Sequence, residues 1–215
     1  MATMGLHEHN YWWERAMART AGRAPDQTRR ALLDAAARIV RERGVSARLD
    51  DIAQAAGVSK GGLLYYYANK DELLDALACD MHSSFRDRVK QELDPDDPGP
   101  GALTRAYVRA ALAPRIDTSA FREGIALQLQ LIVVPRILAM TQRDNAIWRA
   151  ELGTDGLPAH IVSLVVAAAD GASLGPVWGG PESDAKARRI VTQLDRILSS
   201  PDLWAALDPA RQPAL

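Results

Sequence analysis

The chain has 215 residues, of which 47% are hydrophobic and 25% charged, enough to form the core of one large domain or of two small ones. Its only cysteine, Cys79, excludes an internal disulfide framework and a cysteine-based zinc site. The densest apolar stretch, Ile161–Ala169, is too short to cross a membrane, and the N-terminus lacks the apolar segment of a secretory signal, so we expect a cytoplasmic protein without a membrane partner.

The net charge of −1 conceals an asymmetry along the chain. Residues 1–70 carry 11 Lys and Arg against 7 Asp and Glu, whereas residues 71–215 carry 15 against 20. A polyanion would bind the basic end, but the same bias also occurs in proteins that bind no nucleic acid. Charge alone therefore does not decide the function.

Helical periodicity runs through the sequence, and alternating strand patterns are nearly absent. Pro and Gly residues separate the helical segments, and their densest group, Asp94–Gly101, is expected to be a surface loop. Pro135 either ends one helix or kinks a longer one. Helices are expected at about 28–43, 49–56, from 59 onward, 69–93, 102–113, 119–134, 136–152, 158–174 and 183–199.

Local signals mark several of these helix ends. Thr28 is expected to cap the first helix, and Gly44 to end it in the left-handed conformation. Asn69 and Glu72 have the spacing of a capping box at the start of a long helix. These signals depend only on neighbouring residues, so they can be read without knowing the tertiary fold.

Residues 49–67, LDDIAQAAGVSKGGLLYYY, have the layout of a helix-turn-helix. Ile52 and Val58 supply apolar surface between two helices, and Gly57 can take the positive φ of a sharp turn. Ser59 would cap the second helix, in which Leu63 and Tyr67 share an inward face. Paired glycines at 61 and 62 indicate close approach of the backbone rather than helix stability. On this pattern alone, the segment could also be an ordinary helical corner.

The motifs Asp51-Ile52-Ala53, Ala56–Gly61 and Asn69–Leu74, with Leu63 between them, resemble the DNA-binding signature of the TetR family. The Ser-Lys-Gly-Gly-Leu-Leu sequence of the recognition helix is typical of a subset of that family. The resemblance, which covers about Thr28 to Leu77, implies an all-α protein. Its expected parts are an N-terminal extension at 1–24, a three-helix helix-turn-helix domain at 25–74 and a larger helical domain for effector binding and dimerisation at 75–215.

The resemblance implies a sequence-specific transcriptional regulator, a homodimeric repressor released from near-palindromic operator DNA by a small-molecule effector. Tyr66 and Lys70 would bind phosphates, with backbone amides at the starts of two helices adding to them. Tyr66 could instead be a core aromatic residue, and Lys70 a solvated lysine. The full set of implied DNA contacts is Thr28, Arg48, Ser59, Lys60, Gly61, Gly62, Leu64, Tyr65, Tyr66 and Lys70.

Three positions depart from the family pattern. Arg48 stands where the family usually has Thr or Ser, so either Ser46 caps the following helix or Arg48 points at phosphate. Asp50 stands where some relatives carry a basic residue, and phosphates would repel its carboxylate unless it stays at the helix N-terminus or accepts from a cytosine amino group. We expect no base contact from Asp50. Leu64 replaces a common aromatic residue but could still touch a thymine methyl group.

Ahead of Thr28, the residues Tyr11-Trp12-Trp13 and three arginines allow a minor-groove arm, a mobile tail or a packed helix. Near the other end, Pro158–Leu174 is apolar almost all round and Ser183–Ser199 is amphipathic. Two such helices could form a four-helix interface across a two-fold axis, although a monomer could pack both internally. The expected dimer contacts are Val165, Ala168, Ala172, Ile190, Leu194 and Ile197.

The effector is expected to be small and largely apolar, because the middle helices combine bulky apolar side chains with a few polar ones. Each apolar member of the set could equally belong to the core. The candidate effector contacts are Phe121, Arg122, Gln128, Leu131, Met140, Trp148 and His160.

Two other classes of function stay open at this stage. An enzyme is not expected, because the sequence has no Ser/His/Asp or Cys/His arrangement, no His-x-x-x-His spacing and no phosphate-binding glycine loop. We accordingly expect no catalytic residues, no cofactor and no metal site. The alternative is a helical interaction protein of the same fold that has lost specific DNA binding, an interpretation that Asp50 and Leu64 keep open.

Overall fold

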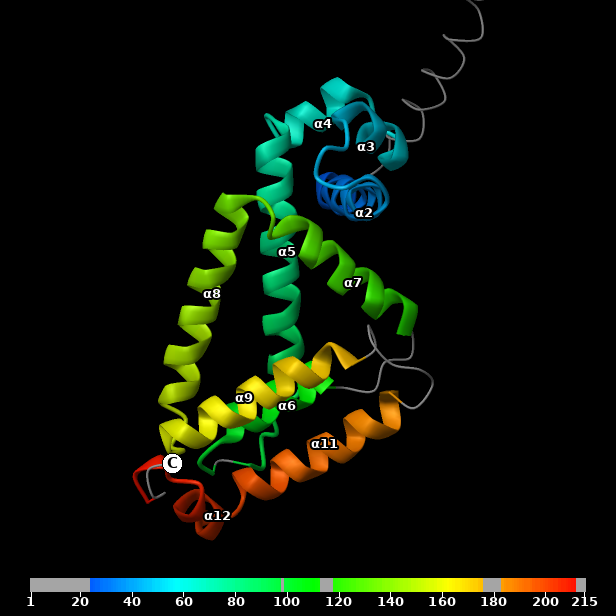
Figure 1. The fold of residues 1–215 in the computed structure, drawn as a ribbon. Helices are drawn as coiled ribbons and strands as arrows, with labels where there is room; N and C mark the ends of the chain where they lie inside the picture. The colour runs from blue at the N-terminus through cyan, green and yellow to red at the C-terminus, as the bar shows by residue number, and fades with distance from the viewer. Residues whose placement is uncertain (1–23, 98, 113–117, 176–182, 212–215) are drawn as a thin grey trace, which may run out of the picture. The chain divides into compact units, whose positions relative to one another are not determined.

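The computed structural model describes residues 24–97, 99–112, 118–175 and 183–211 (Figure 1). Every regular element within these ranges is a helix, which confirms the all-α prediction. The helices are α2 (Pro25–Arg43), α3 (Leu49–Ala56), α4 (Lys60–Tyr66), α5 (Lys70–Gln91), α6 (Ala102–Leu112), α7 (Thr118–Leu131), α8 (Pro135–Gly153), α9 (Ala159–Ser173), α11 (Ser183–Leu198) and α12 (Pro201–Ala206), with a 3-10 turn, η1 (Pro209–Arg211).

Most helix boundaries lie within a few residues of the expected ones, and Pro135 separates α7 from α8 rather than kinking one helix. The helix α12 was not predicted from the sequence, although Ser200 caps it and Pro201 occupies its first turn. The proposed alternatives for the segment ahead of Thr28 concern residues 1–23, which lie outside the described ranges, as does Ala113 at the expected end of α6.

The prediction that Thr28 caps the first helix is wrong. The helix α2 begins at Pro25, with Ala24 in the N-cap position, and the Thr28 amide donates to the Ala24 carbonyl oxygen at 3.1 Å. Proline at the first position of a helix needs no amide partner, so it is a start signal that competes with a Thr cap. Thr28 is therefore an internal, buried residue of the first turns, 6% exposed.

The end of α2 also differs from the prediction. Gly44 has the expected positive φ of 73°, but its ψ of −179° is extended and not left-handed helical. Almost no residue other than glycine adopts this backbone conformation. The prediction that a glycine ends α2 is therefore confirmed, whereas the left-handed helical conformation predicted for it is wrong.

The described residues form two compact units. One contains the residues up to Met81 together with Ala126–Leu138, and the other contains His82–Ile125 and the residues from Ala139 onward. Three helices, α5, α7 and α8, contribute residues to both units. The predicted domain boundary at residue 74 concerns which parts fold independently, and it stays a prediction.

The first unit is built around the contact between α2 and α3. Val40 of α2 and Ile52 of α3 are fully buried, and Ala53, 2% exposed, is small enough to let the helices approach each other. Leu63 of α4 and Leu73 of α5 are buried at 0% exposure in the same unit. This core orients α4 relative to α3 through apolar packing, which contributes about 1.5–3 kcal/mol for each large side chain.

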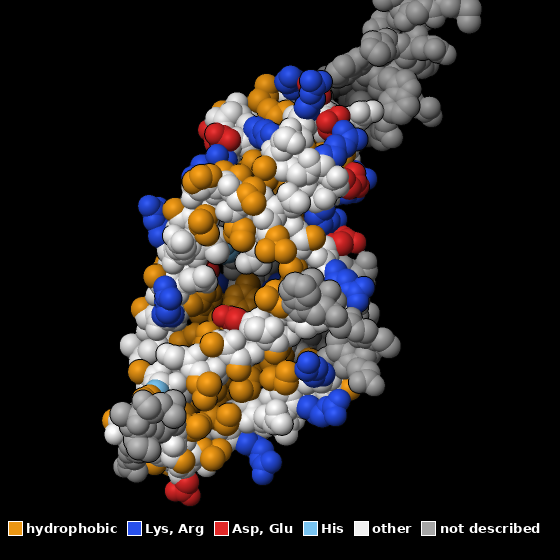
Figure 2. All heavy atoms as spheres, in the orientation of Figure 1, with side chains coloured by type: hydrophobic (Ala, Val, Ile, Leu, Met, Phe, Trp, Pro, Cys, Tyr) orange, Lys and Arg blue, Asp and Glu red, His pale blue; other side chains and the backbone are white. Residues whose placement is uncertain are grey.

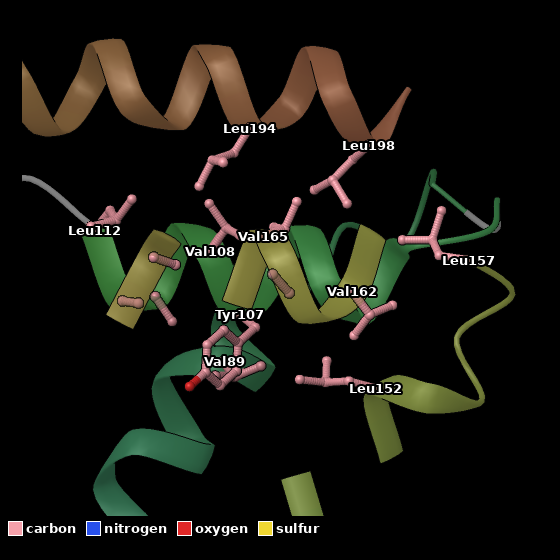
Figure 3. Close-up of a cluster of buried hydrophobic side chains, with 14 of the residues drawn as sticks. Val89, Tyr107, Val108, Leu112, Leu152, Leu157, Val162, Val165, Leu194 and Leu198 are labelled. Carbon is pink, nitrogen blue, oxygen red and sulfur yellow. The ribbon is translucent and has the colours of Figure 1, made fainter. Parts of the chain in front are cut away.

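The core of the second unit lies between α6, α9 and α11, as Figure 3 shows. Val108 of α6, Val165 of α9 and Leu198 of α11 point into it and are 0–1% exposed. Leu194, at 5% exposure, points into the same core from α11. The prediction that Val165 and Leu194 contact a second copy is therefore wrong, because both side chains are buried by their own chain.

The Asp155 carboxylate forms hydrogen bonds with the start of α6. Asp155 Oδ2 accepts hydrogen bonds from the Thr104 amide at 2.6 Å and from the Thr104 hydroxyl at 2.7 Å. The Gly101 amide donates to the Asp155 carbonyl oxygen at 2.7 Å, with Gly101 at φ +85°. These bonds satisfy amides that a helix start leaves unpaired, so the proline-rich segment before α6 ends in a fixed position.

Among the described residues, no single helix combines the length and mean hydropathy of a membrane span. The bent pair formed by Arg122–Leu131 and Pro135–Gly153 passes the same test when its two helices are taken together.

Candidate nucleic-acid interface

One glycine sets the turn between α3 and α4. Gly57 ends α3 with φ 72° and ψ 30°, and its amide donates to the carbonyl oxygens of Ala53 and Gln54. A side chain is strained in this left-handed conformation, whereas glycine adopts it freely. The predicted role of Gly57 is confirmed.

Ser59 caps α4, as its position predicts. Its hydroxyl oxygen accepts a hydrogen bond from the Gly62 amide at 3.0 Å. A Cβ atom at position 62 would lie 3.3 Å from that oxygen, whereas a Cβ atom at position 61 would lie 3.9 Å away. Gly62 therefore keeps the cap clear, and the exposed Gly61 leaves the backbone of α4 open to a close approach.

One side of α4 is buried and the other faces solvent. Leu63 is fully buried, and Tyr67, just after the helix, is 5% exposed, as predicted for the inward face. Burial raises the pKa of the Tyr67 phenol, so the side chain stays neutral in the core. The outward side carries Lys60, Gly61, Leu64 and Tyr65, with Tyr65 84% exposed. An exposed stripe on a helix that is fixed from behind is the geometry of a recognition helix.

Lys60 is paired with an acid from the preceding helix. Its Nζ lies 3.1 Å from Oδ2 of Asp50, in the first turn of α3, and the two side chains are 54% and 61% exposed. The neighbouring Asp51 pairs instead with Arg43 of α2, at 2.9 Å. The two consecutive acids thus have different partners. At this exposure, each ion pair contributes no more than about 1 kcal/mol to stability.

A capping box opens α5 directly after the recognition helix. The Asn69 side chain accepts from the Glu72 amide at 2.9 Å, and Glu72 accepts from the Ala68 amide at 3.0 Å. The reciprocal bond therefore goes to Ala68 and not to the Asn69 amide that an ideal box would use. Lys70, in the first turn of α5, and Tyr66, at the end of α4, are both half-buried.

Two residues that were predicted to contact DNA, Thr28 and Arg48, differ in their exposure. Thr28 is buried and its amide is already bonded, so it has neither a side chain nor an amide to offer DNA, which corrects that prediction. Arg48 is exposed at the N-cap position of α3 and forms no capping bond in the described structure. Ser46 does not replace it, because its hydroxyl donates to the Arg43 carbonyl oxygen at 3.3 Å.

Two segments of the chain match established families. Residues 32–77, which include the helix-turn-helix, match the bacterial regulatory proteins of the tetR family. Residues 101–199 match the tetracyclin repressor-like C-terminal domain. The chain belongs to the TetR family.

Two relatives of this chain bear regulator names. The probable HTH-type transcriptional regulator ArpR of Pseudomonas putida is 34% identical over 85 residues, which is 37% of this chain and 40% of that protein. The HTH-type transcriptional repressor LfrR of Mycolicibacterium smegmatis is 37% identical over 116 residues, or 54% of this chain and 58% of that protein. The matched segments thus cover less than two thirds of either relative.

Solved structures show that the TetR fold extends over most of the chain. A TetR-like transcriptional regulator from Rhodococcus sp. RHA1 aligns with a TM-score of 0.62 at 22% identity, over 83% of this chain and 100% of that one. The multidrug-binding protein EbrR, complexed with malachite green, aligns with a TM-score of 0.61 at 21% identity, over 80% and 98%.

Trp148, a predicted effector contact in the C-terminal part of this TetR protein, is 7% exposed and lies in an aromatic cluster. Its ring meets Tyr107 and Phe85 edge to face, with centroid distances of 5.3 and 5.7 Å, and the Arg86 guanidinium carbon lies 4.4 Å from its centroid. Its Nε1 is buried without a hydrogen-bond partner in the described structure. A buried donor without a partner costs about 1–3 kcal/mol.

Two other effector candidates already have structural roles. Leu131 is 2% exposed and packs in a core. His160 has its Nε2 at 3.0 Å from the Trp204 carbonyl oxygen, which fastens α12 to the start of α9.

The remaining effector candidates stay predictions. Arg122 and Gln128 are exposed, Met140 is half-buried, and the side chain of Phe121 lies outside the described part of the structure. Gln128 belongs to the unit with the helix-turn-helix, and Arg122 and Met140 belong to the other.

The sequence pattern indicated repulsion by phosphate, a place at the helix N-terminus or a cytosine contact for Asp50, but not its pairing with Lys60. The two residues are ten positions apart and a turn separates them, so no helical spacing rule connects them. The sequence offered one signal for this pairing: each residue lies in the first turn of one of the two helices of the motif.

Proposed function

We propose that this chain is a sequence-specific, DNA-binding transcriptional regulator. The observation that carries the proposal is the exposed side of α4, whose Ser59 cap and buried Leu63 fix it so that Lys60, Leu64 and Tyr65 face solvent. Lys60, Gly61, Leu64 and Tyr65 approach base edges in the major groove, and Arg48, Tyr66 and Lys70 contact phosphates. In this proposal residues 25–74 form the DNA-binding domain, and residues 75–215 bind the effector and dimerise.

We also propose that the protein acts as a homodimer through α9 and α11. Figure 2 shows apolar side chains gathered over these helices, where Leu164 is 45% exposed and Leu174 41%. The half-buried Ala168, Ala172, Ile190 and Ile197 keep part of their surface available. A two-fold axis would place two recognition helices about 34 Å apart, in successive major grooves, so the operator should be near-palindromic.

The regulator is proposed to be a repressor that a small molecule releases. The support is the repressor name of LfrR and the complex of EbrR with malachite green. Within this chain, Trp148 supplies an aromatic face and an unused N–H, a combination typical of a ligand site. An effector that prefers the DNA-incompetent dimer 100-fold would weaken operator binding by about 2.7 kcal/mol.

Selection of duplexes from a random DNA library, using the purified full chain, tests the DNA-binding proposal. The expected result is one enriched site made of two inverted half-sites, bound by a particle with the mass of a dimer in light scattering. Duplexes enriched without any shared sequence, or no binding at low salt, would instead favour the interaction protein that has lost specific DNA binding.

A dye screen followed by titration tests the effector proposal, with malachite green as the first probe. A true effector raises the midpoint of thermal unfolding and weakens operator binding, and the operator must weaken dye binding by the same factor, because the coupling is reciprocal. Trp148→Phe keeps an aromatic side chain, although a smaller one, and removes the N–H, so it should lower dye affinity. Compounds that stabilise the protein without changing operator affinity would contradict a sensing role.

A further inference from the structure

The ion pair between Lys60 and Asp50 lies at the start of the recognition helix, and the proposed DNA contact does not explain it. A lysine that only bound phosphate would gain nothing from an acid at 3.1 Å, since the acid offsets its positive charge and is itself repelled by DNA. Both side chains are more than half exposed, so the pair is not needed to neutralise a buried charge.

The local structure holds the acid in place. Asp50 lies in the first turn of α3, where the helix dipole favours a negative charge. Asp51 cannot take over its role, because it is bound to Arg43. The helices α3 and α4 pack on each other, with Ile52 and Leu63 both fully buried, and this packing fixes the distance between the two helix starts. The backbone therefore holds Asp50 and Lys60 in fixed positions, and together they form a unit in which a donor and an acceptor lie side by side.

This unit matches the edge of one base pair. In the major groove a G·C pair presents the N7 and O6 acceptors of guanine and then the N4 donor of cytosine. Guanine O6 and cytosine N4 are hydrogen-bonded to each other, so they lie roughly 2.9 Å apart. The Lys60 Nζ and Asp50 Oδ2, at 3.1 Å, have nearly the same spacing and the complementary polarity.

An A·T pair fits the same unit less well in either orientation. With adenine under Lys60, the acid faces thymine O4 and loses its solvation without gaining a donor. With thymine under Lys60, thymine O4 and adenine N6 match the polarity of the unit, but the thymine methyl group stands in place of guanine N7, so the lysine loses one acceptor.

We propose that Asp50 and Lys60 together read a single G·C base pair in each half-site, with Lys60 on guanine and Asp50 on cytosine. This inference rests on the proposed DNA-binding function and makes Asp50 a specificity-determining residue. It replaces the expectation, drawn from the sequence, that Asp50 makes no base contact. Binding requires no proton transfer, because both groups keep the charges they carry in the free protein.

The experiment compares DNA selections by the wild-type chain, Asp50→Ala, Lys60→Ala and the double variant. Asp87→Ala is the matched control, because Asp87 forms an exposed pair with Lys90 at 3.2 Å, away from the helix-turn-helix. Circular dichroism at each step confirms that the variants stay folded.

Asp50→Ala should lower the preference for C·G over T·A at one position of each half-site by roughly 5- to 100-fold. Lys60→Ala should lower the preference at the same base pair, the double variant should lose no more than the larger single effect, and Asp87→Ala should leave the preferences unchanged. The inference is overturned if Asp50→Ala strengthens binding to all sequences alike, because the acid then only reduces positive charge. It is also overturned if the two single variants affect different base pairs. A wild-type chain that enriches no sequence would overturn the proposed function itself, and this inference with it.

Discussion

The hydroxyl of Tyr107 donates a hydrogen bond to Oδ1 of Asp170, with 2.8 Å between the two oxygens. The bond joins α6 to α9 beside the aromatic cluster of Trp148. Burial raises the pKa of Tyr107, and the nearby Asp170 charge raises it further. Burial also raises the pKa of Asp170, against the opposing effect of the hydrogen bond.

Tyr107→Phe should lower the free energy of unfolding by about 0.5–1.5 kcal/mol. The ring keeps its packing, and Asp170 loses one donor but retains access to water, so the loss stays near that of a single hydrogen bond. Urea unfolding at neutral pH measures it. A loss as large as that of Tyr107→Ala would show that the ring, and not the hydroxyl, is what the substitution disturbs.

Asp170 should make the protein less stable as the pH rises. Because its pKa in the folded state lies above the ordinary 3.8, folding favours the protonated form, and this contribution is complete below 3.8 and lost as the pH rises through the raised pKa. Asp170→Asn removes the titration. We expect the stability of this variant relative to wild type to improve on going from pH 3.5 to pH 7, as measured by urea unfolding at both ends of the range. A difference that does not change with pH would contradict the raised pKa.

Leu164 and Val165 are neighbours in sequence with opposite surroundings, 45% and 0% exposed. Leu164→Arg should give a folded monomer, because it places a charge only in the proposed dimer interface. Val165→Arg should lose about 4 kcal/mol or more of unfolding free energy and fail to fold, because it buries an unpaired charge. Light scattering and circular dichroism separate the two results. A folded dimer of Leu164→Arg would show that this face of α9 is not the interface.

Gly57→Ala should lower the unfolding free energy by about 1 kcal/mol, and Gly57→Asn by less, since Asn tolerates the left-handed conformation. The cost comes from the backbone alone, because no described atom lies within 4 Å of an added Cβ. Gly124→Ala in α7 is the control. It has equal space and no positive φ, so it should raise stability by about 0.5–1 kcal/mol. This account would be contradicted if Gly57→Ala and Gly124→Ala changed the unfolding free energy in the same direction.

Lys70→Ala and Tyr66→Phe should weaken binding to selected and random duplexes by similar factors, because phosphate contacts carry no sequence information. Lys70→Ala should also reduce the slope of log K against log salt by about one unit. Fluorescence anisotropy at several salt concentrations provides both numbers. A loss confined to the selected sequence, with an unchanged slope, would assign Lys70 to base recognition instead.

The sequence by itself determined the features that depend on neighbouring residues. The turn at Gly57, the cap formed by Ser59 and the box formed by Asn69 and Glu72 are each closed by bonds within a few positions, so the residue types suffice to place them. The end of α3 is fixed locally by Gly57 in the same way, whereas its start at Arg48 has no side-chain cap. The competing start signals of Pro25 and Thr28 show the limit of such reading, since both are valid local signals and only the packing of Thr28 into the core decided between them.

Only the tertiary structure decided which faces are used. The helix α9 is apolar almost all round, so no periodic signal distinguishes the buried Val165 from the exposed Leu164, and the difference arises from the positions of α6 and α11. In the same way, Asp50 became a partner of Lys60 because the packing of α3 on α4 brings the two helix starts together. Contacts between residues on different helices depend on how those helices pack, and local sequence patterns do not contain that information.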